Sequence, residues 1–307
     1  MARDVENPVL AQAALILAVF FWASSFVAMK HAVGYLDPGL IVFIRMIIAS
    51  TCFILIYKLW NSISYFRGDW KYFLIMSVCD PGLYFFLESQ ALKYTSASAA
   101  GTINSLQPPL LALSAWIFLR ERPSSVTFIG ATISIIGAVL LTAASPTIES
   151  SPNPWLGNTL EFGAMASSTI YIIVLKKLSD RYNPLFLTAL QAFGGAVLFA
   201  PLLYTADIPV AVPTSAWLAI FYLATFVTFG GYFLYNWGVT KSTAIVASAY
   251  LNLIPVFSVG LAFVFLNERL TTFQICMVLV IIFGVFVSQS SQFFRPAGRR
   301  CISREPL

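Results

Sequence analysis

The feature that most constrains this chain is a series of apolar runs, each about 20 residues long and separated by short gaps. A helix needs roughly 20 apolar residues to cross a bilayer, and soluble helices average about 11. Only 10% of the residues are charged, against roughly 25% in soluble domains, so lipid must cover most of the surface. The sequence therefore predicts an all-α polytopic membrane protein with ten transmembrane helices, at about 9–30, 38–58, 70–92, 95–119, 124–143, 155–177, 184–204, 214–239, 242–266 and 271–291.

The basic residues predict the orientation. If the N-terminus is inside, 14 of the 18 Lys and Arg residues fall on the cytoplasmic side, 3 fall outside and Arg45 lies within a span. This bias matches the positive-inside rule and predicts that both termini are cytoplasmic in a multi-pass protein of the inner membrane. The basic residues are scattered through short gaps, so we expect lipid and a small molecule as partners and no nucleic acid.

An internal repeat organises the ten spans. With a shift of 147 residues, Pro108 aligns with Pro255, and each is followed at the same distance by Phe-Leu-x-Glu-Arg, ending at Arg122 and Arg269. The shift pairs the fourth span with the ninth and the fifth with the tenth, so each repeat has five spans. Because five is odd, the second copy must enter the membrane from the opposite side, which gives two inverted-topology repeats.

The repeat also predicts the organisation of the chain. The Ser/Pro-rich stretch between the fifth and sixth spans reads as the connection between the halves. We expect a cytoplasmic tail at 1–8, a first five-helix repeat at 9–143, a linker at 144–154, a second repeat at 155–291 and a basic cytoplasmic tail at 292–307.

Several local motifs make the resemblance to a known family specific. They are Trp22-Ala-Ser-Ser-Phe26, Arg45, the Ala91-Leu-Lys-Tyr-Thr-Ser-Ala97 hinge and the two Pro…Phe-Leu-x-Glu-Arg runs. With these motifs the chain resembles the drug/metabolite transporter superfamily, as an EamA-type transporter with two EamA domains over about residues 9–290. The resemblance implies ten helices, cytoplasmic termini and, in many members, export of small metabolites or amino acids. It does not imply a particular cargo.

Away from the ends of the predicted spans, four charged residues lie in the hydrocarbon region, where each costs about 2.5–3.5 kcal/mol or more. They are Arg45, Asp80, Glu88 and Glu161. Arg45 either forms a structural ion pair with Glu88 or Glu161 or contacts cargo. The carboxylates either bind a proton or cation or pair structurally. Asp80, Tyr84 and Glu88 recur at i, i+4 and i+8, which predicts one polar face on the third helix.

Polar and aromatic side chains supply the other candidates. Pro108 and Pro255 each interrupt an apolar helix, so we expect kinks whose freed carbonyls are available to cargo. The candidate cargo-binding residues are Trp22, Arg45, Tyr84, Glu88, Asn104, Gln107, Glu161, Gln191, Tyr235, Asn236 and Asn252, and the coupling-ion candidates are Asp80, Glu88 and Glu161. Gln191 aligns with Arg45 and Tyr235 with Glu88, so the charges belong to one copy only.

These patterns predict a secondary transporter that moves an amino acid, nucleoside or drug-like compound by alternating access, with proton-driven export as the preferred direction. The rivals are an uncoupled uniporter or exchanger, a lipid-modifying enzyme and a non-transporting scaffold or receptor. We expect no enzyme activity, metal or cofactor, because one His and four scattered Cys residues lack the spacing of such sites. Gly130, Ser134 and Ala138 recur every four residues, which predicts close helix packing in the bundle or at a dimer contact. We expect the protein to be a monomer or a homodimer.

Overall fold

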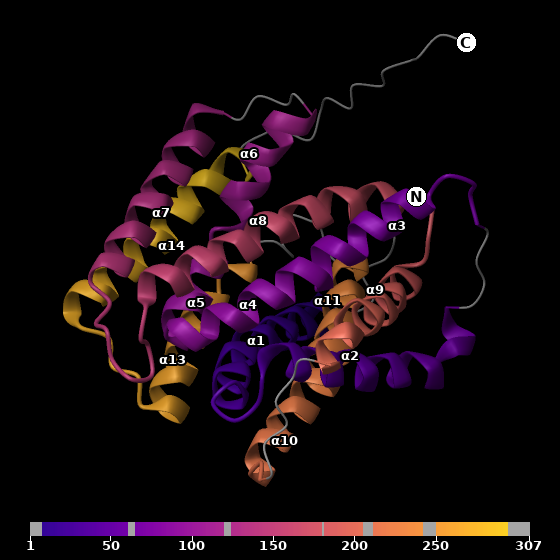
Figure 1. Ribbon diagram of the computed structural model, residues 1–307. Coiled ribbons are helices and arrows are strands. Elements are labelled where there is room, and N and C mark those ends of the chain that lie inside the picture. Colours follow the sequence, from indigo (N-terminus) through magenta and orange to yellow (C-terminus); the bar gives the residue numbers. More distant parts are fainter. Residues whose placement is uncertain are drawn as a thin grey trace.

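A computed structural model describes residues 8–60, 65–119, 124–179, 181–204, 211–241 and 250–293, and every regular element in these ranges is helical (Figure 1). The first half contains α1 (Pro8–Ala32), α2 (Pro38–Leu55), η1 (Tyr57–Leu59), α3 (Trp70–Ser77), η2 (Val78–Leu83), α4 (Tyr84–Tyr94), α5 (Ala97–Asn104), α6 (Gln107–Leu119) and α7 (Ser125–Ala143). The second half contains α8 (Pro154–Ser179), α9 (Pro184–Phe199), η3 (Ala200–Tyr204), α10 (Thr214–Tyr222), η4 (Leu223–Gly231), α11 (Tyr232–Lys241), α13 (Ile254–Leu266) and α14 (Thr272–Phe293).

Seven uninterrupted stretches in the described residues are long and apolar enough to cross a membrane. They correspond to the expected first, second, fifth, sixth, seventh, eighth and tenth spans. The expected third and fourth spans are divided into shorter helices, and the described part of the ninth is α13. The fold is therefore the expected polytopic helical membrane protein, with helices that break inside the bundle.

Equivalent helices of the two halves begin in the same way. The side chains of Asp37 and Asn183 each accept a hydrogen bond from the backbone N–H two residues later, and a proline follows each of them at the first helical position. An Asx cap followed by proline is a strong start signal, because proline loses no helical hydrogen bond there. The capped helices α2 and α9 are therefore local copies of one another.

The packing of α7 on α14 shows that the copies run in opposite directions. These helices lie side by side (Figure 1). A methyl group added at Gly130 would meet backbone atoms of Ser288 and Gly284, and one at Gly137 would meet Ile281. Residue numbers rise on one helix as they fall on the other, so these equivalent helices are antiparallel. The small residues of α7 thus pack within the bundle.

Two spans that are equivalent in the repeats contain a π-helical segment at matching positions. These segments are η2 and η4, and a shift of 147 places the whole of η2 within η4. A π-helical turn breaks the regular i→i−4 pattern and usually marks a functional position. Both segments lie within spans that the sequence predicts, the third and the eighth.

The predicted proline kinks also take a different form. α5 ends at Asn104 and α6 begins at Gln107, so Pro108 lies in the first turn of a new helix. Pro255 lies in the first turn of α13. Proline is well tolerated at this position because its missing N–H would be unbonded anyway. The chain therefore breaks before each proline instead of bending at it.

A polar network closes one end of the bundle, and we call it the Glu268 seal. The Glu268 carboxylate accepts hydrogen bonds from the backbone N–H groups of Ala97 and Ser98, both at 2.9 Å, and from the Ser98 hydroxyl at 2.7 Å. Asn267, at φ 53°, ends α13 in the left-handed conformation just before Glu268. The Lys30 ammonium donates to three main-chain carbonyls, those of Leu92, Thr95 and Ser150, each at 2.6 Å. Glu121 and Arg122, the other copy of the Glu-Arg pair, lie outside the described residues.

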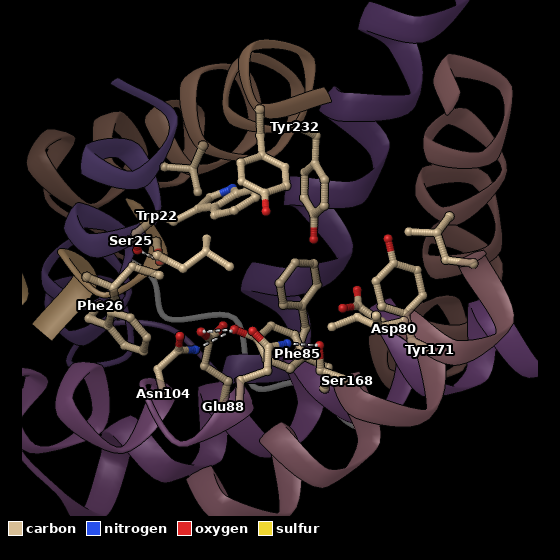
Figure 2. Close-up of a pocket in the computed structure, with 18 of the residues that line it drawn as sticks. Trp22, Ser25, Phe26, Asp80, Phe85, Glu88, Asn104, Ser168, Tyr171 and Tyr232 are labelled. Atoms are coloured by element: carbon tan, nitrogen blue, oxygen red, sulfur yellow. Dashed lines mark hydrogen bonds between the residues drawn. The ribbon is translucent and has the colours of Figure 1, made fainter. Parts of the chain in front are cut away.

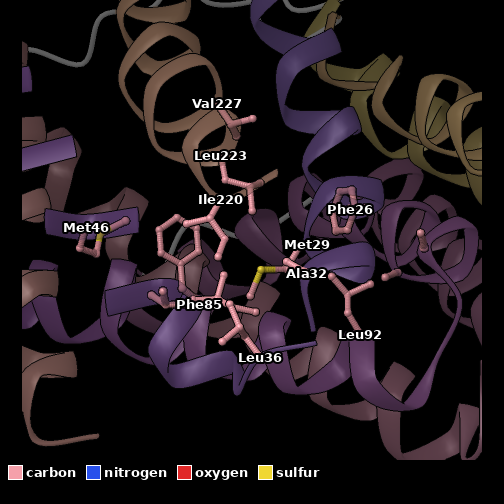
Figure 3. Close-up of a cluster of buried hydrophobic side chains, with 14 of the residues drawn as sticks. Phe26, Met29, Ala32, Leu36, Met46, Phe85, Leu92, Ile220, Leu223 and Val227 are labelled. Carbon is pink, nitrogen blue, oxygen red and sulfur yellow. The ribbon is translucent and has the colours of Figure 1, made fainter. Parts of the chain in front are cut away.

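The largest apolar core lies just below this seal. It contains buried side chains of α1, α2, α4, α5, η4 and α13, including Phe26, Met29, Leu92 and Leu223 (Figure 3). Fully burying such a side chain contributes about 1.5–3 kcal/mol in water, and in a bilayer close packing takes over that role. Both halves contribute to this core, so it joins the two repeats at the sealed end.

Candidate functional site

A cavity of about 240 Å³ lies between the two halves (Figure 2). α1, α2, η2, α4, α5 and α6 contribute from the first half, and α8, η4, α11 and α13 from the second. The lining residue Phe26 also belongs to the large core, which fills the space from the cavity towards the Glu268 seal. The cavity is larger than the roughly 150 Å³ hollow that admits benzene in a protein interior, so a small organic molecule fits it.

Eight of the ionisable, polar and aromatic residues singled out from the sequence line this cavity. They are Trp22, Arg45, Asp80, Tyr84, Glu88, Asn104, Gln107 and Tyr235. Three other candidates, Glu161, Gln191 and Asn252, are not among the lining residues, and the side chain of Asn236 lies outside the described part. Asn252 donates to Gln289 of α14 at 3.0 Å and so holds a helix contact instead.

Arg45 is held by groups of both halves. Its Nε donates to the Thr228 hydroxyl at 2.7 Å, and its guanidinium carbon lies 4.1 Å from the centre of the Phe85 ring. Thr228 in turn donates to the carbonyl of Leu223, five residues earlier in the π-helical segment η4. Within the described residues, Arg45 forms no ion pair within 4.0 Å. The structural ion pair with Glu88 or Glu161 is therefore not formed in this conformation.

A contact between Gln191 and Asp80 is the equivalent of the contact between Arg45 and Thr228, with the roles of the two repeats exchanged. Gln191 donates to the Asp80 backbone carbonyl at 3.0 Å and lies 3.5 Å from its carboxylate. The Asp80 backbone is extended, with φ −148° and ψ 112°, inside the π-helical segment η2. Regular helical spacing from Tyr84 therefore does not explain how Asp80 reaches the cavity. Arg45 on α2 and Gln191 on α9 are equivalent residues. Each of them donates a hydrogen bond to the π-helical segment of the opposite repeat, Arg45 to η4 and Gln191 to η2.

A second polar chain begins at Glu88. The Tyr84 hydroxyl donates to the Glu88 carboxylate at 2.9 Å, and the Asn104 amide lies 3.4 Å from that hydroxyl. Behind them, Glu161 of α8 is fully buried, and neither of its carboxylate oxygens has a hydrogen-bond partner among the described residues. Glu161 lies on α8, which packs along α4, the helix that carries Glu88. The two glutamates are thus neighbours in different environments.

Aromatic rings form the opposite wall (Figure 2). The Trp22 ring centre lies 4.8 Å from that of Tyr235 and 5.3 Å from that of Tyr232. Gln107 donates to the Ser168 hydroxyl at 2.8 Å, which connects α6 to α8. The cavity lining therefore combines ring faces with a few polar groups, as small-molecule sites usually do.

Sequence reasoning missed one complete face of the cavity. Ser168, Tyr171, Ile172 and Leu175 of α8 all line it. They recur at i, i+3, i+4 and i+7, which is the spacing of one helical face. The helix is apolar around most of its circumference, so the sequence does not distinguish this face from the others. The polar side chains of Ser168 and Tyr171 are the features that could have indicated it.

Comparisons with known proteins agree with this architecture. The EamA-like transporter family matches residues 9–143 and 155–289. A protein of Archaeoglobus fulgidus named as an uncharacterized transporter is 28% identical over 273 residues, covering 89% of this chain and 96% of its own. A chloroplastic WAT1-related protein of Arabidopsis thaliana is 26% identical, covering 92% of this chain and 70% of its own.

Comparison with solved structures supports the same fold. A crystal structure with 19% sequence identity superposes with a TM-score of 0.65, covering 93% of this chain and 99% of its own. At this identity the likeness concerns the fold alone. The family match spans most of the chain. The family and the relative from Archaeoglobus fulgidus are named as transporters and not as enzymes. The chain is therefore a small-molecule transporter of the membrane and belongs to the EamA-like transporter family, with one family domain in each half.

Proposed function

We propose that this protein is a secondary transporter that exports a small organic metabolite by alternating access, in exchange for protons. The cargo site is the cavity between the repeats, and Arg45, Asp80, Tyr84 and Glu88 are its principal polar residues. Trp22 and Tyr235 supply its aromatic wall. A secondary transporter needs a central site that opens to one side at a time, and inverted repeats provide two equivalent conformations for this purpose.

The observation that carries this proposal is the position of the cavity between a sealed end and the broken helices. The large core and the Glu268 seal fill the end of the bundle where α1 ends and α5 begins. If both termini are cytoplasmic, as the basic residues predict, the sealed end faces outward. The conformation is then closed to the outside, and its conversion to an outward-open state must break the seal.

Glu161 is the preferred proton carrier. An ionised carboxylate without a hydrogen-bond donor costs several kcal/mol inside a membrane protein, so we assign a proton to Glu161 in this conformation. Movement of α8 against α4 during the transport cycle changes its surroundings and allows the proton to leave. Glu88, which already accepts a hydrogen bond from Tyr84, is the adjacent site at which cargo influences this proton.

The test is flux in proteoliposomes containing purified protein, with a panel of amino acids, nucleosides and cationic drugs and with or without a pH gradient. We expect flux of at least one compound that the gradient accelerates, and loss of this acceleration in Glu161→Gln. Glu149→Gln, in the exposed linker, is the matched control and should behave as wild type. Gradient-independent flux would instead identify an uncoupled uniporter or exchanger, and absence of flux for the whole panel would favour a scaffold or receptor.

Orientation requires its own measurement. Single cysteines at Thr147 and Arg67 lie in loops that we assign to the outside and the inside. In intact cells, a membrane-impermeant maleimide should modify the cysteine at Thr147 and leave the one at Arg67 unmodified. The reverse pattern would mean that the sealed end faces the cytoplasm.

A further inference from the structure

The charges around the cavity do not balance, and this imbalance points to a class of cargo. Asp80 and Glu88 line the cavity and are 3% and 4% exposed, whereas Arg45, which is 2% exposed, is the one basic lining residue in the part of the chain that the structure describes. Buried charges in a low-dielectric site need compensation from a partner. With both carboxylates ionised, the lining carries one negative charge more than it has positive charges.

Arg45 is committed to the wall. Its Nε binds Thr228 and its guanidinium lies over Phe85. It makes no ion pair within 4.0 Å among the described residues. An arginine fixed in this way contributes one positive charge to the cavity and forms no ion pair with Asp80 or Glu88. Its single positive charge balances only one of the two carboxylates, so one negative charge remains when both are ionised.

The two carboxylates retain unused hydrogen-bonding capacity. A carboxylate has about four acceptor positions. Among the described residues, the Glu88 carboxylate accepts one hydrogen bond, from Tyr84, and the Asp80 carboxylate accepts one from the Ser168 hydroxyl and lies 3.5 Å from the Gln191 amide. Both residues face the cavity, so a cargo carrying N–H donors or a positive charge meets acceptors that the protein leaves unfilled.

The aromatic wall favours the same chemistry. Trp22, Tyr232 and Tyr235 lie together across the cavity, and Tyr171 lies beside Asp80 (Figure 2). Ring faces attract cations by about 0.5–2 kcal/mol, with tryptophan the strongest. They also accommodate an apolar ring of the cargo. Carboxylates on one side and ring faces on the other form a cavity suited to an ammonium group attached to a small hydrophobic body.

From these observations we infer that the cargo is an organic monocation, an amine or ammonium compound with an apolar or aromatic body. This inference rests on the proposed function, since it concerns the same cavity. With a bound monocation, the summed net charge of the lining groups and the cargo is zero. A zwitterion leaves the surplus unchanged, and an anion increases it.

The test compares four compounds with one skeleton by isothermal titration calorimetry on the detergent-purified protein at about pH 6, where an α-amino group is protonated. They are phenylalaninamide as the cation, phenylalanine as the zwitterion, hydrocinnamate as the anion and hydrocinnamamide as the neutral compound. We expect the cation to bind at least about tenfold more tightly than each of the others. Equal or tighter binding of the zwitterion, the anion or the neutral compound would overturn the inference, as would failure of the cation to bind.

Two variants identify the residues responsible. Asp80→Asn and Glu88→Gln should each reduce the preference for the cation over the neutral compound by about tenfold, and Glu149→Gln should leave it unchanged. An unchanged preference in both folded variants would also contradict the inference, and the wild-type series decides it if a variant fails to fold. Binding is measured without a membrane, so cation binding with no flux would refute the proposed function alone. Gradient-driven flux with preference for the zwitterion would refute the monocation alone.

Discussion

The Glu268 seal offers the sharpest test of the structure. The Glu268 carboxylate accepts three hydrogen bonds from the start of α5, across the boundary between the two repeats. A hydrogen bond to a charged group contributes about 1.5–3 kcal/mol, and loss of a helix cap costs about 0.5–2 kcal/mol. Water replaces part of the lost bonding when the seal opens, so we take about 2 kcal/mol for Glu268→Ala. That value corresponds to a roughly 30-fold shift toward open conformations.

The assay is the rate of maleimide modification at a buried position beside the seal. Ala100 of α5 is fully buried in the large core, so Ala100→Cys reports opening when the four native cysteines are replaced. We expect Glu268→Ala to increase its modification rate by at least about tenfold. The matched control is Lys93→Met, which removes the half-exposed ion pair with Asp37 and should have little effect, because such pairs contribute at most about 1 kcal/mol. An equal rate in Glu268→Ala and in the control would refute the seal.

The remaining predictions concern packing and buried cations. Gly130→Ala should lower the melting temperature in detergent, because its new methyl group meets backbone atoms of Gly284 and Ser288 on α14, whereas Gly260→Ala, with nothing within 4 Å of the added carbon, should leave it equal or raise it. Lys30→Met should lower it by leaving three carbonyl groups of the seal without their donor, which costs about 2–3 kcal/mol; thermal unfolding followed by size-exclusion chromatography measures this loss. Arg45→Lys should reduce proteoliposome flux severalfold despite keeping the charge, because lysine cannot both donate to Thr228 and lie flat over Phe85; wild-type flux would contradict this reading.

The membrane class and the repeat follow from sequence because each depends on a one-dimensional signal. The length of an apolar run fixes whether it spans a bilayer, and a repeated Pro…Phe-Leu-x-Glu-Arg run fixes which spans correspond. The ionisable residues Arg45, Asp80 and Glu88 stood out for the same reason, since charge inside a span is costly. These residues were predicted as candidates, and the structure places all three at one cavity.

What the sequence could not supply is the local phase of each helix. Asp80, Tyr84 and Glu88 line one cavity, but Asp80 has an extended backbone in the π-helical segment η2, so regular i, i+4, i+8 helical spacing is not what brings it there. On α8, Ser168 and Tyr171 face the cavity, but Glu161, which carried the stronger sequence signal, is buried behind Glu88. Charge shows that a residue matters, and only packing shows which way it points.

The two repeats share a geometry and differ in charge, and the contacts of η2 and η4 show how both properties coexist. Arg45 and Gln191 are equivalent, and each hydrogen-bonds the π-helical segment of the opposite repeat, at Thr228 and at Asp80. In the first contact the charged residue is the donor, Arg45 on α2. In the second the charged residue is Asp80, on the π-helical segment η2. If the two repeats exchange conformations, as the proposed alternating access requires, we expect both hydrogen bonds to persist, because each needs only a long donor and a nearby oxygen. It does not exchange the charges, which stay on α2, η2 and α4. In the proposed cycle the cavity therefore keeps its charged wall on the first repeat in both conformations, and we expect cargo to meet the same carboxylates whichever side is open.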